Sequence, residues 1–287
     1  MEIAVIADLH GNYEAFKACV SYLANRSIEA ILFLGDYVGE FGFPQQTMAL
    51  LKQLDESYTC HWIKGNKEDY WLKQQASSEA LWKEYDSTTG SLYYTYHQLT
   101  PDDLAFFASL PITRDVHFPG YPPITLCHGS PLKVNQPLLI NDEDTQRILA
   151  SCPGDLIVCG HTHIQQVITG NNRRAINPGS IGVPLYSQQK TQFMILHGEE
   201  GQWREEFISL NYAMELEIER LSQSGLSLYA PYWTKTTIQI LRHGNDSHAR
   251  VLSLAMAYCE QERGECIWPF IPEIYWERAY RELYEKK

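Results

Sequence analysis

Histidines, carboxylates and one amide follow short apolar segments of this sequence, at the points where those segments would end as strands. His161 and His163 come directly after the apolar segment 155–159. Because alternate residues of an extended chain face the same way, both imidazoles are expected to reach into one site. Neutral imidazole is the commonest protein ligand for metal ions. Four other strand ends carry comparable groups: Asp8 with His10, Asp36, Asn66, and His128.

These five strand ends together predict a metal site. One divalent ion takes about four to six ligands, so seven converging groups indicate two ions that share a bridging carboxylate. Oxygen and nitrogen ligands without thiolate favour Mn, Fe, Zn or Ni over Ca or Cu(I), and Mn is the favoured choice. The alternative is that each histidine has a separate structural role. Five strand ends of the same kind are difficult to explain in that way.

Alternating strands and helices precede and separate these groups. In the N-terminal region the apolar patterns predict strands at 2–7, 30–34 and 61–64 and helices at 13–25 and 44–54. Asn12 can cap the first of these helices, and Pro44 suits the first turn of the second. This alternation is typical of a parallel sheet, whose sites lie at the carboxyl ends of its strands.

An aromatic-rich segment from about 67 to 112 interrupts the alternation and is predicted to be an inserted helical cap, with Thr100 as the cap of one helix. Its aromatic side chains are interpreted mainly as core, and alternatively as a surface on which a substrate base stacks. Strands then return at 124–127 and 155–159, followed by a hairpin of 165–169 with 174–176 and strands near 193–196 and 203–209. These later strands are expected to be antiparallel, which would make the sheet system mixed.

The last part of the chain, 211–287, is predicted to be a helical extension without a ligand-rich motif. Its helices are expected at 214–221, 236–241, 250–262 and 272–284. His243 and His248 flank the sequence Gly-Asn-Asp and are interpreted as part of a solvated loop.

Composition limits the possible partners. The 287 residues include 23 Lys and Arg against 35 Asp and Glu, a net charge of −12. An extended nucleic-acid surface is therefore not expected, because phosphate backbones are bound by clustered basic residues. A small phosphorylated or nucleotide substrate remains possible, since bound cations would dominate the local field. Seven scattered cysteines without a zinc-type pair, and the lack of any apolar segment of ~20 residues, predict a cytoplasmic protein with reduced thiols and no membrane contact.

The ordered series D-x-H-G-N, G-D, G-N, H-G and G-H-T-H, within residues 1–210, resembles the calcineurin-like metallophosphoesterases. The resemblance implies an α/β fold, a four-layer α/β/β/α sandwich of mixed sheets, with the core at 1–210, a cap insert at about 67–112 and a helical extension at 211–287. It also implies two metal sites. The first would be held by Asp8, His10 and His163, the second by Asn66, His128 and His161, with Asp36 bridging the two ions.

Two departures from the family pattern point to a subclass. Many members have Gly-Asn-His where this chain has Gly65-Asn66-Lys67, so the histidine that helps to protonate the leaving group is missing. Lys67 is expected either to offer its charge to a phosphate oxygen or to point into solvent. Substrates with good leaving groups should then be favoured. Ser/Thr protein phosphatases carry Asp-Arg where this chain has Gly39-Glu40, which favours the bacterial and archaeal phosphodiesterase-like branch, some of whose members hydrolyse dinucleoside polyphosphates.

The function that these features predict is hydrolysis of phosphodiesters or nucleotide phosphoanhydrides, such as diadenosine tetraphosphate, by a metal-bound hydroxide. Asp36, Asn66 and Lys67 are the candidate catalytic residues, and Lys67 is also the candidate substrate-binding residue. One alternative is a protein phosphatase or phosphomonoesterase. Another is a catalytically inactive scaffold that binds metals, for which the loss of the histidine at Lys67 is the one supporting feature. The physiological substrate, native metal pair, oligomeric state and role of the extension stay open at this level.

Overall fold

The computed structural model describes residues 1–244 and 247–285 of the chain. Over these residues the backbone forms the strands β1 (Glu2–Ile6), β2 (Ile28–Phe33), β3 (Thr59–Trp62), β4 (Thr113–Val116), β5 (Ile124–Cys127), β6 (Leu156–Val158), β7 (Gln165–Gly170), β8 (Arg173–Pro178), β9 (Thr191–Glu199) and β10 (Gln202–Leu210). The helices are α1 (Tyr13–Leu23), α2 (Pro44–Ser57), α3 (Asn66–Ala76), α4 (Gly90–Tyr96), α5 (Pro101–Ser109), α6 (Glu143–Ser151), α7 (Met214–Gln223), α8 (Leu226–Tyr229), α9 (Pro231–His243), α10 (His248–Arg263) and α11 (Glu273–Tyr284).

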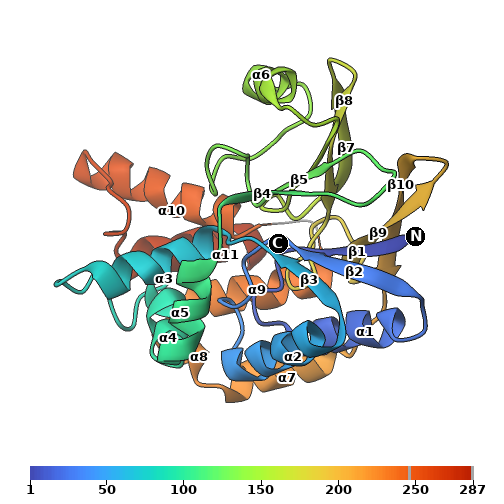
Figure 1. Cartoon of the computed structure of the whole chain (residues 1–287). Helices are drawn as coiled ribbons and strands as arrows, with labels where there is room; N and C mark the ends of the chain where they lie inside the picture. The colour runs from blue at the N-terminus through green and yellow to red at the C-terminus, as the bar shows by residue number, and fades with distance from the viewer. Residues whose placement is uncertain (245–246, 286–287) are drawn as a thin grey trace.

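Two five-stranded sheets form the centre of the molecule (Figure 1). The first has the order β10-β9-β1-β2-β3, and the second has the order β4-β5-β6-β8-β7. Both are mixed: β1 is parallel to β2 but antiparallel to β9, and β6 is parallel to β8, which is itself antiparallel to β7. The sheets therefore have the mixed strand directions that the sequence predicted.

Alternation along β1 explains how the layers are held together. Ile3 and Val5 pack into an apolar core that also contains residues of both sheets, whereas Ala4 and Ile6 belong to a core shared with α1 and α2. Successive side chains of a strand point to opposite faces, so a strand buried on both faces is apolar throughout. At the outer face of the second sheet, α6 packs through Ile148 of a separate apolar cluster. The result is the four-layer α/β/β/α sandwich that was predicted.

Local signals in the sequence account for several element boundaries. The side chain of Asn12 accepts a hydrogen bond from the backbone of Ala15, and Pro44 is the first residue of α2, so both predicted helix starts are confirmed. Thr100 and Asp103 form a reciprocal capping box at α5. The antiparallel hairpin of β7 and β8 is also confirmed, but the expectation that the later strands are only antiparallel was wrong, because β8 completes a parallel pair with β6.

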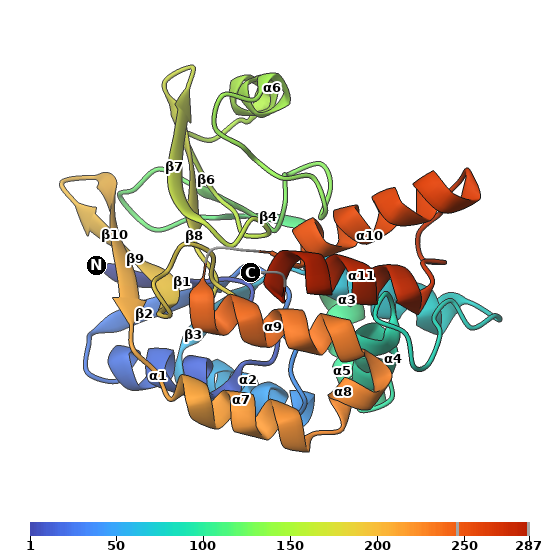
Figure 2. The ribbon, with the colours of Figure 1, turned by 180° about the vertical axis from the view of Figure 1, so that it is seen from behind.

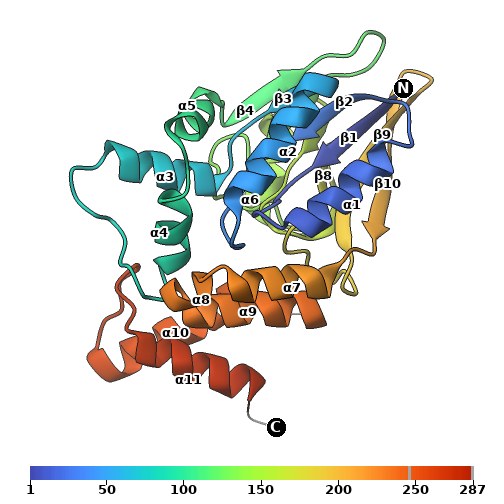
Figure 3. The same ribbon diagram turned by 90° about the horizontal axis from the view of Figure 1, so that it is seen from below.

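Aromatic residues of the insert belong to the hydrophobic core, as the sequence predicted for most of them. Trp71 and Phe107 are fully buried, and Trp82 is nearly so. The insert also contacts the C-terminal helices, because Glu273 of α11 accepts hydrogen bonds from the backbone and hydroxyl of Ser87. Figure 3 shows the C-terminal helices gathered along one side of the molecule, with α7 beside α1. The division of the chain at residue 210 stays a prediction.

None of the helices in 1–244 and 247–285 is long and apolar enough to cross a membrane. Cys19, Cys127 and Cys159, which lie in apolar segments of the sequence, are buried in the core as expected for small apolar side chains.

Candidate metal centre

All seven predicted ligands lie where strands of the two sheets end, and the structure brings their side chains together. The first group consists of Asp8, His10 and His163, whose ligand atoms all lie within 4.8 Å of one another. The Nε2 atoms of His10 and His163 are 3.0 Å apart, and Nε2 of His163 is 3.3 Å from Oδ1 of Asp8. These three side chains therefore converge on one point.

A second group shares Asp8 with the first and adds Asp36 and His128. Nε2 of His128 lies 3.5 Å from Oδ2 of Asp36 and 3.1 Å from Oδ1 of Asn66. His161 lies beside this group, with its ring centroid 5.2 Å from that of His128. Five of the seven side chains therefore belong to the two groups, Asn66 is bonded to them through His128, and His161 lies adjacent.

The unpaired atoms of this cluster fit divalent ions. Oδ1 of Asp8 is buried and finds no hydrogen-bond partner among the residues that the structure describes. A buried carboxylate oxygen without a partner is costly, unless a cation satisfies it. Hard carboxylate oxygens with borderline imidazole nitrogens are a donor set for Mn, Fe, Zn or Ni. The residues present therefore fit divalent ions of this kind.

Hydrogen bonds from the backbone fix the orientation of two of the imidazoles, and a close carboxylate contact holds a third. Nδ1 of His128 lies 2.8 Å from the carbonyl of Leu34, and Nδ1 of His163 lies 2.8 Å from the carbonyl of Val183. Each ring then donates through Nδ1, which leaves Nε2 as the neutral nitrogen that faces the cluster. The third ring, His10, has its Nδ1 2.5 Å from a carboxylate oxygen of Glu40.

The backbone at the candidate ligands is strained. Asp8, His10, Asp36, His161 and His163 all have positive φ angles, between 53° and 69°. Residues other than glycine adopt this region rarely and at a cost of order 1–3 kcal/mol each, and they concentrate at functional sites. The strained turns redirect each side chain from its strand into the shared site.

Glycines beside the ligands allow the loops to approach one another. A Cβ atom on Gly65 would lie 2.1 Å from Oδ1 of Asp36, and one on Gly160 would lie 2.6 Å from Oδ2 of Asp8. Neither distance is compatible with a side chain. The recurrence of glycine before Asn66 and His161 is therefore a packing requirement of the site.

A family model for the calcineurin-like phosphoesterase superfamily domain matches residues 1–201. The chain belongs to this superfamily. A curated relative, an uncharacterized protein of Methanocaldococcus jannaschii, is 26% identical over 246 residues, which cover 80% of this chain and 94% of the relative.

Solved structures agree with the metallophosphoesterase fold. The crystal structure of a hypothetical protein of Pyrococcus horikoshii matches 86% of this chain and 99% of its own length, with a TM-score of 0.70 and 22% identity. A metallophosphoesterase of Sphaerobacter thermophilus matches 85% of this chain and 100% of its own length, with a TM-score of 0.66 and 22% identity. These two matches show the fold alone. The family binds divalent metals, and the residues described above are the candidate ligands in this member.

Charge interactions within the metallophosphoesterase site have clear directions. Burial opposes ionisation of Asp8, but His163, His128 and His10 outweigh it and hold the pKa of the Asp8 carboxyl below its usual range. For His161 burial acts with the neighbouring His128 and lowers the pKa of the imidazole to about 4. His161 is therefore neutral at pH 7, the form that binds metal.

Lys67, which replaces the histidine of many family members, does not point into solvent. Its side chain is 10% exposed, and its ammonium lies 2.5 Å from Oε1 of Glu40. Burial opposes the charge, but Glu40 and Asp36 raise the pKa of Lys67 above its usual value. The ammonium also lies over the ring of Trp233, 5.5 Å from its centroid. The solvent alternative was wrong, and binding of a phosphate by Lys67 stays a prediction.

Glu40 joins this lysine to the candidate metal ligands. One oxygen of its carboxylate contacts Lys67, and the other contacts Nδ1 of His10. Burial raises the pKa of Glu40, but His10 and Lys67 more than offset this effect and hold it well below its usual range. In the sequence, Glu40 is recognisable only as the residue in place of an arginine. The spacing of the motifs gives no indication that Glu40 contacts His10.

Residues of the C-terminal extension also reach the site, which the sequence analysis missed. The interpretation of His248 as part of a solvated loop was wrong: it is half-buried, it begins α10, and its ring stacks on Trp233 at 4.2 Å. Burial chiefly lowers the pKa of His248 to about 3, and His10 and His163 are among the charged groups that act on it. His243 is exposed at the end of α9, while Asn245 and Asp246 of the predicted loop lie outside the described residues.

Two separate cavities border the candidate ligands. One, of about 260 Å³, is lined by Asn66, Tyr70, Lys73 and Lys133 among others. The second, of about 290 Å³, is lined by His161 and His163 together with residues of α9 and the beginning of α10. Figure 2, which views the molecule from behind, shows α9, α10 and α11 lying together.

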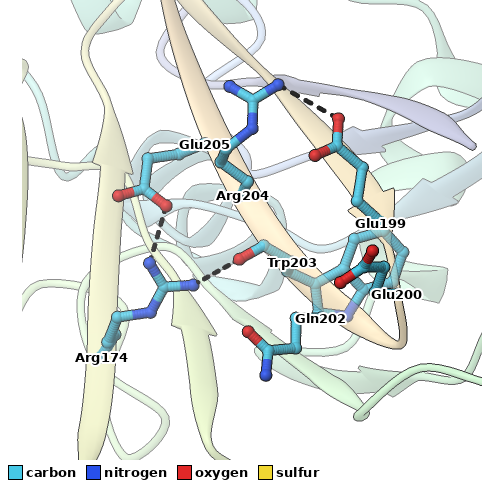
Figure 4. Close-up of a pocket in the computed structure, with 7 residues that line it drawn as sticks. All are labelled: Arg174, Glu199, Glu200, Gln202, Trp203, Arg204 and Glu205. Carbon is cyan, nitrogen blue, oxygen red and sulfur yellow. Dashed lines mark hydrogen bonds and ion pairs between the residues drawn. The ribbon is translucent and has the colours of Figure 1, made fainter.

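A larger hollow, of about 870 Å³, lies away from the metal centre against β10 (Figure 4). Its arginines are paired with its own acidic residues, Arg174 with Glu205 and Arg204 with Glu199. Because these guanidinium groups already have carboxylate partners, the hollow offers little charge to an anionic ligand.

Proposed function

We propose that this metallophosphoesterase hydrolyses phosphodiesters or nucleotide phosphoanhydrides, such as diadenosine tetraphosphate, with two divalent ions, of which Mn is favoured. The observation that carries this proposal is the pair of cavities beside the candidate ligands. A diester or anhydride phosphorus bears a substituent on two sides, and each substituent needs room. A phosphomonoester would leave one cavity without an occupant.

The geometry of Asp36 supports its assignment as the bridge between the ions. Its Oδ2 lies 3.8 Å from Nε2 of His10 and 3.5 Å from Nε2 of His128, so one carboxylate faces both halves of the cluster. Asp8, His10 and His163 would hold one ion, and Asn66, His128 and His161 the other. Asp8 also belongs to both of the tight groups.

Bound in this way, the ions would supply Lewis-acid polarisation of the phosphate and activation of a water molecule. The protein contributes orientation. Asp36 is held because its Oδ1 accepts a hydrogen bond of 2.9 Å from the backbone N–H of Lys67 and its own N–H donates to Glu68. Asn66, bonded to His128, positions the second half of the cluster. We assign the Lys67 side chain to the phosphate of the substrate, on the side of the site that Glu40 and Trp233 border.

The charge at Glu40 argues against the protein phosphatase alternative. A buried carboxylate occupies the position at which that branch has a phosphate-binding arginine, and this carboxylate offsets most of the positive charge that Lys67 brings to the phosphate. The local charge available to a dianionic monoester is correspondingly small. A monoanionic diester, or an anhydride with a good leaving group, needs less compensation and no dedicated acid.

The test is hydrolysis by the full chain after chelation and reloading with Mn. A panel would contain p-nitrophenyl phosphate, bis(p-nitrophenyl) phosphate and diadenosine tetraphosphate. We expect turnover of the diester or the anhydride to exceed that of the monoester. A monoester preference would move the chain to the phosphatase branch, and metal binding without turnover of any compound would support the scaffold alternative.

A further inference from the structure

One wall of the cavity beside His161 and His163 comes from the C-terminal extension. Ser247, which caps α10, and the first two residues of that helix line this cavity with Ile240 of α9, and the metal-ligand loop lines it from the catalytic core. The extension is therefore placed to touch whatever is attached to a phosphorus atom at the metal centre.

The chemistry of the lining selects the occupant. Pro137, Val183, Leu185 and Ile240 give the cavity an apolar surface, to which Thr162, Ser247 and His248 add hydrogen-bonding groups. Among its described lining residues there is no lysine or arginine. The cavity at Asn66 differs, because two lysines, Lys73 and Lys133, line it against one carboxylate, Asp69. An additional phosphate group would be attracted to the lysine-lined cavity and not to the one at His248.

His248 is held rigidly in this wall. Its ring stacks on Trp233 with an interplanar angle of 18°, and its Nε2 lies 2.9 Å from the hydroxyl of Thr237. Both partners are on α9, so α9 fixes the ring that α10 carries. A side chain ordered in advance loses little entropy when a ligand binds, which is what a recognition residue requires.

The size of the cavity fits one ring-containing group. Its volume of about 290 Å³ is about twice that of an engineered apolar cavity, of roughly 150 Å³, that binds benzene. Resting on the phosphoesterase activity proposed above, we propose that this cavity binds the uncharged organic substituent of the substrate, an aryl or nucleoside group, and that His248 contacts it as a specificity-determining residue.

The test compares the binding of two phosphodiesters by calorimetry with the Mn-loaded full chain. Diphenyl phosphate carries the predicted ring, and dimethyl phosphate has the same charge without it. Wild type should prefer the phenyl compound. His248→Ala should weaken binding of diphenyl phosphate by about tenfold, the equivalent of one lost contact of roughly 1.4 kcal/mol, and leave dimethyl phosphate unchanged.

Two further variants control for folding and for the general loss of a histidine. His248→Gln keeps a hydrogen-bonding group but no ring and should fall between wild type and His248→Ala. His243→Ala removes an exposed histidine of α9 that does not line the cavity, and it should bind both compounds as wild type does. Equal weakening of both compounds by His248→Ala and His248→Gln would overturn the inference, as would the lack of a phenyl preference in wild type.

Hydrolysis of bis(p-nitrophenyl) phosphate, measured in parallel, separates the two proposals. A phenyl preference that depends on His248 without any hydrolysis would refute the proposed activity and support the binding site. Hydrolysis without a phenyl preference would support the proposed activity and refute the binding site.

Discussion

The buried pair of Glu40 and Lys67 gives a quantitative test of how the metal centre is built. Both side chains are nearly inaccessible, at 3% and 10% exposure, and Glu40 also contacts His10. Glu40→Gln keeps a side chain of similar size but leaves the buried ammonium of Lys67 without its ion-pair partner. Breaking a buried pair in this way destabilises a protein by about 3–5 kcal/mol.

The double variant Glu40→Gln with Lys67→Met removes the unpaired charge. Replacing both partners of a buried pair by neutral groups is often neutral or stabilising, so most of the lost stability should return. The affinity for Mn should not return, because His10 still lacks the carboxylate that orients it. Loss of such a partner lowers metal affinity by about 10–100-fold.

Denaturant unfolding after chelation measures stability without a contribution from bound metal, and calorimetry measures Mn binding separately. Lys67→Met alone serves as the matched control, since Glu40 keeps its contact with His10 in that variant. The reasoning would be refuted if Glu40→Gln unfolded with wild-type stability. It would also fail if the double variant were as unstable as Glu40→Gln, or bound Mn as tightly as wild type.

Two further predictions concern single residues. Asp36→Asn should abolish Mn-dependent turnover, because the proposed bridge between the ions loses its charge, while circular dichroism shows an intact fold; turnover at the wild-type rate would remove Asp36 from the proposed role. Burial raises the pKa of Glu217 to about 7, so the folded state binds an extra proton between about pH 4.5 and 7 and loses stability as the pH rises through that window. The free energy of unfolding of Glu217→Gln should therefore exceed that of wild type by up to about 3 kcal/mol at pH 8 and equal it at pH 4.5, as denaturant unfolding at the two pH values would measure. A difference that is the same at both pH values would show that the ionisation of Glu217 is not its cause.

The fold and the candidate ligands could be predicted because each is encoded locally. A short apolar segment followed by Gly-Asp or Gly-Asn indicates both a strand and the ligand group at its end. The parallel order of β1, β2 and β3 then brings these strand ends to one edge of the sheet. Even α6, which was not predicted, had a local signal: the side chain of Asp142 caps it by accepting from the backbone of Thr145.

Other parts of the site could not be predicted in this way. The partnership of Glu40 with His10 depends on how two loops pack, and the positive φ angles of the ligands are imposed by the surrounding structure. His248 lies 85 residues after His163, on a helix whose position depends on contacts between the extension and the insert, such as Trp276 with Thr88. Neither the spacing of motifs nor the hydrophobic pattern of the sequence indicates such contacts, because they arise only when whole helices and strands pack together.

The departures from the family pattern and the C-terminal extension form one connected arrangement. Lys67 stands where many members have a histidine, and its charge is balanced by Glu40, which stands where one branch has an arginine. The face of Trp233, from the extension, covers the ammonium of Lys67 and stacks on the ring of His248. An unpaired ammonium could not be buried here, and without α9 it would be open to water. The lysine, the carboxylate and the extension therefore depend on one another physically. The specificity of the proposed phosphoesterase activity should follow from all three together, and a core without the extension should not reproduce it.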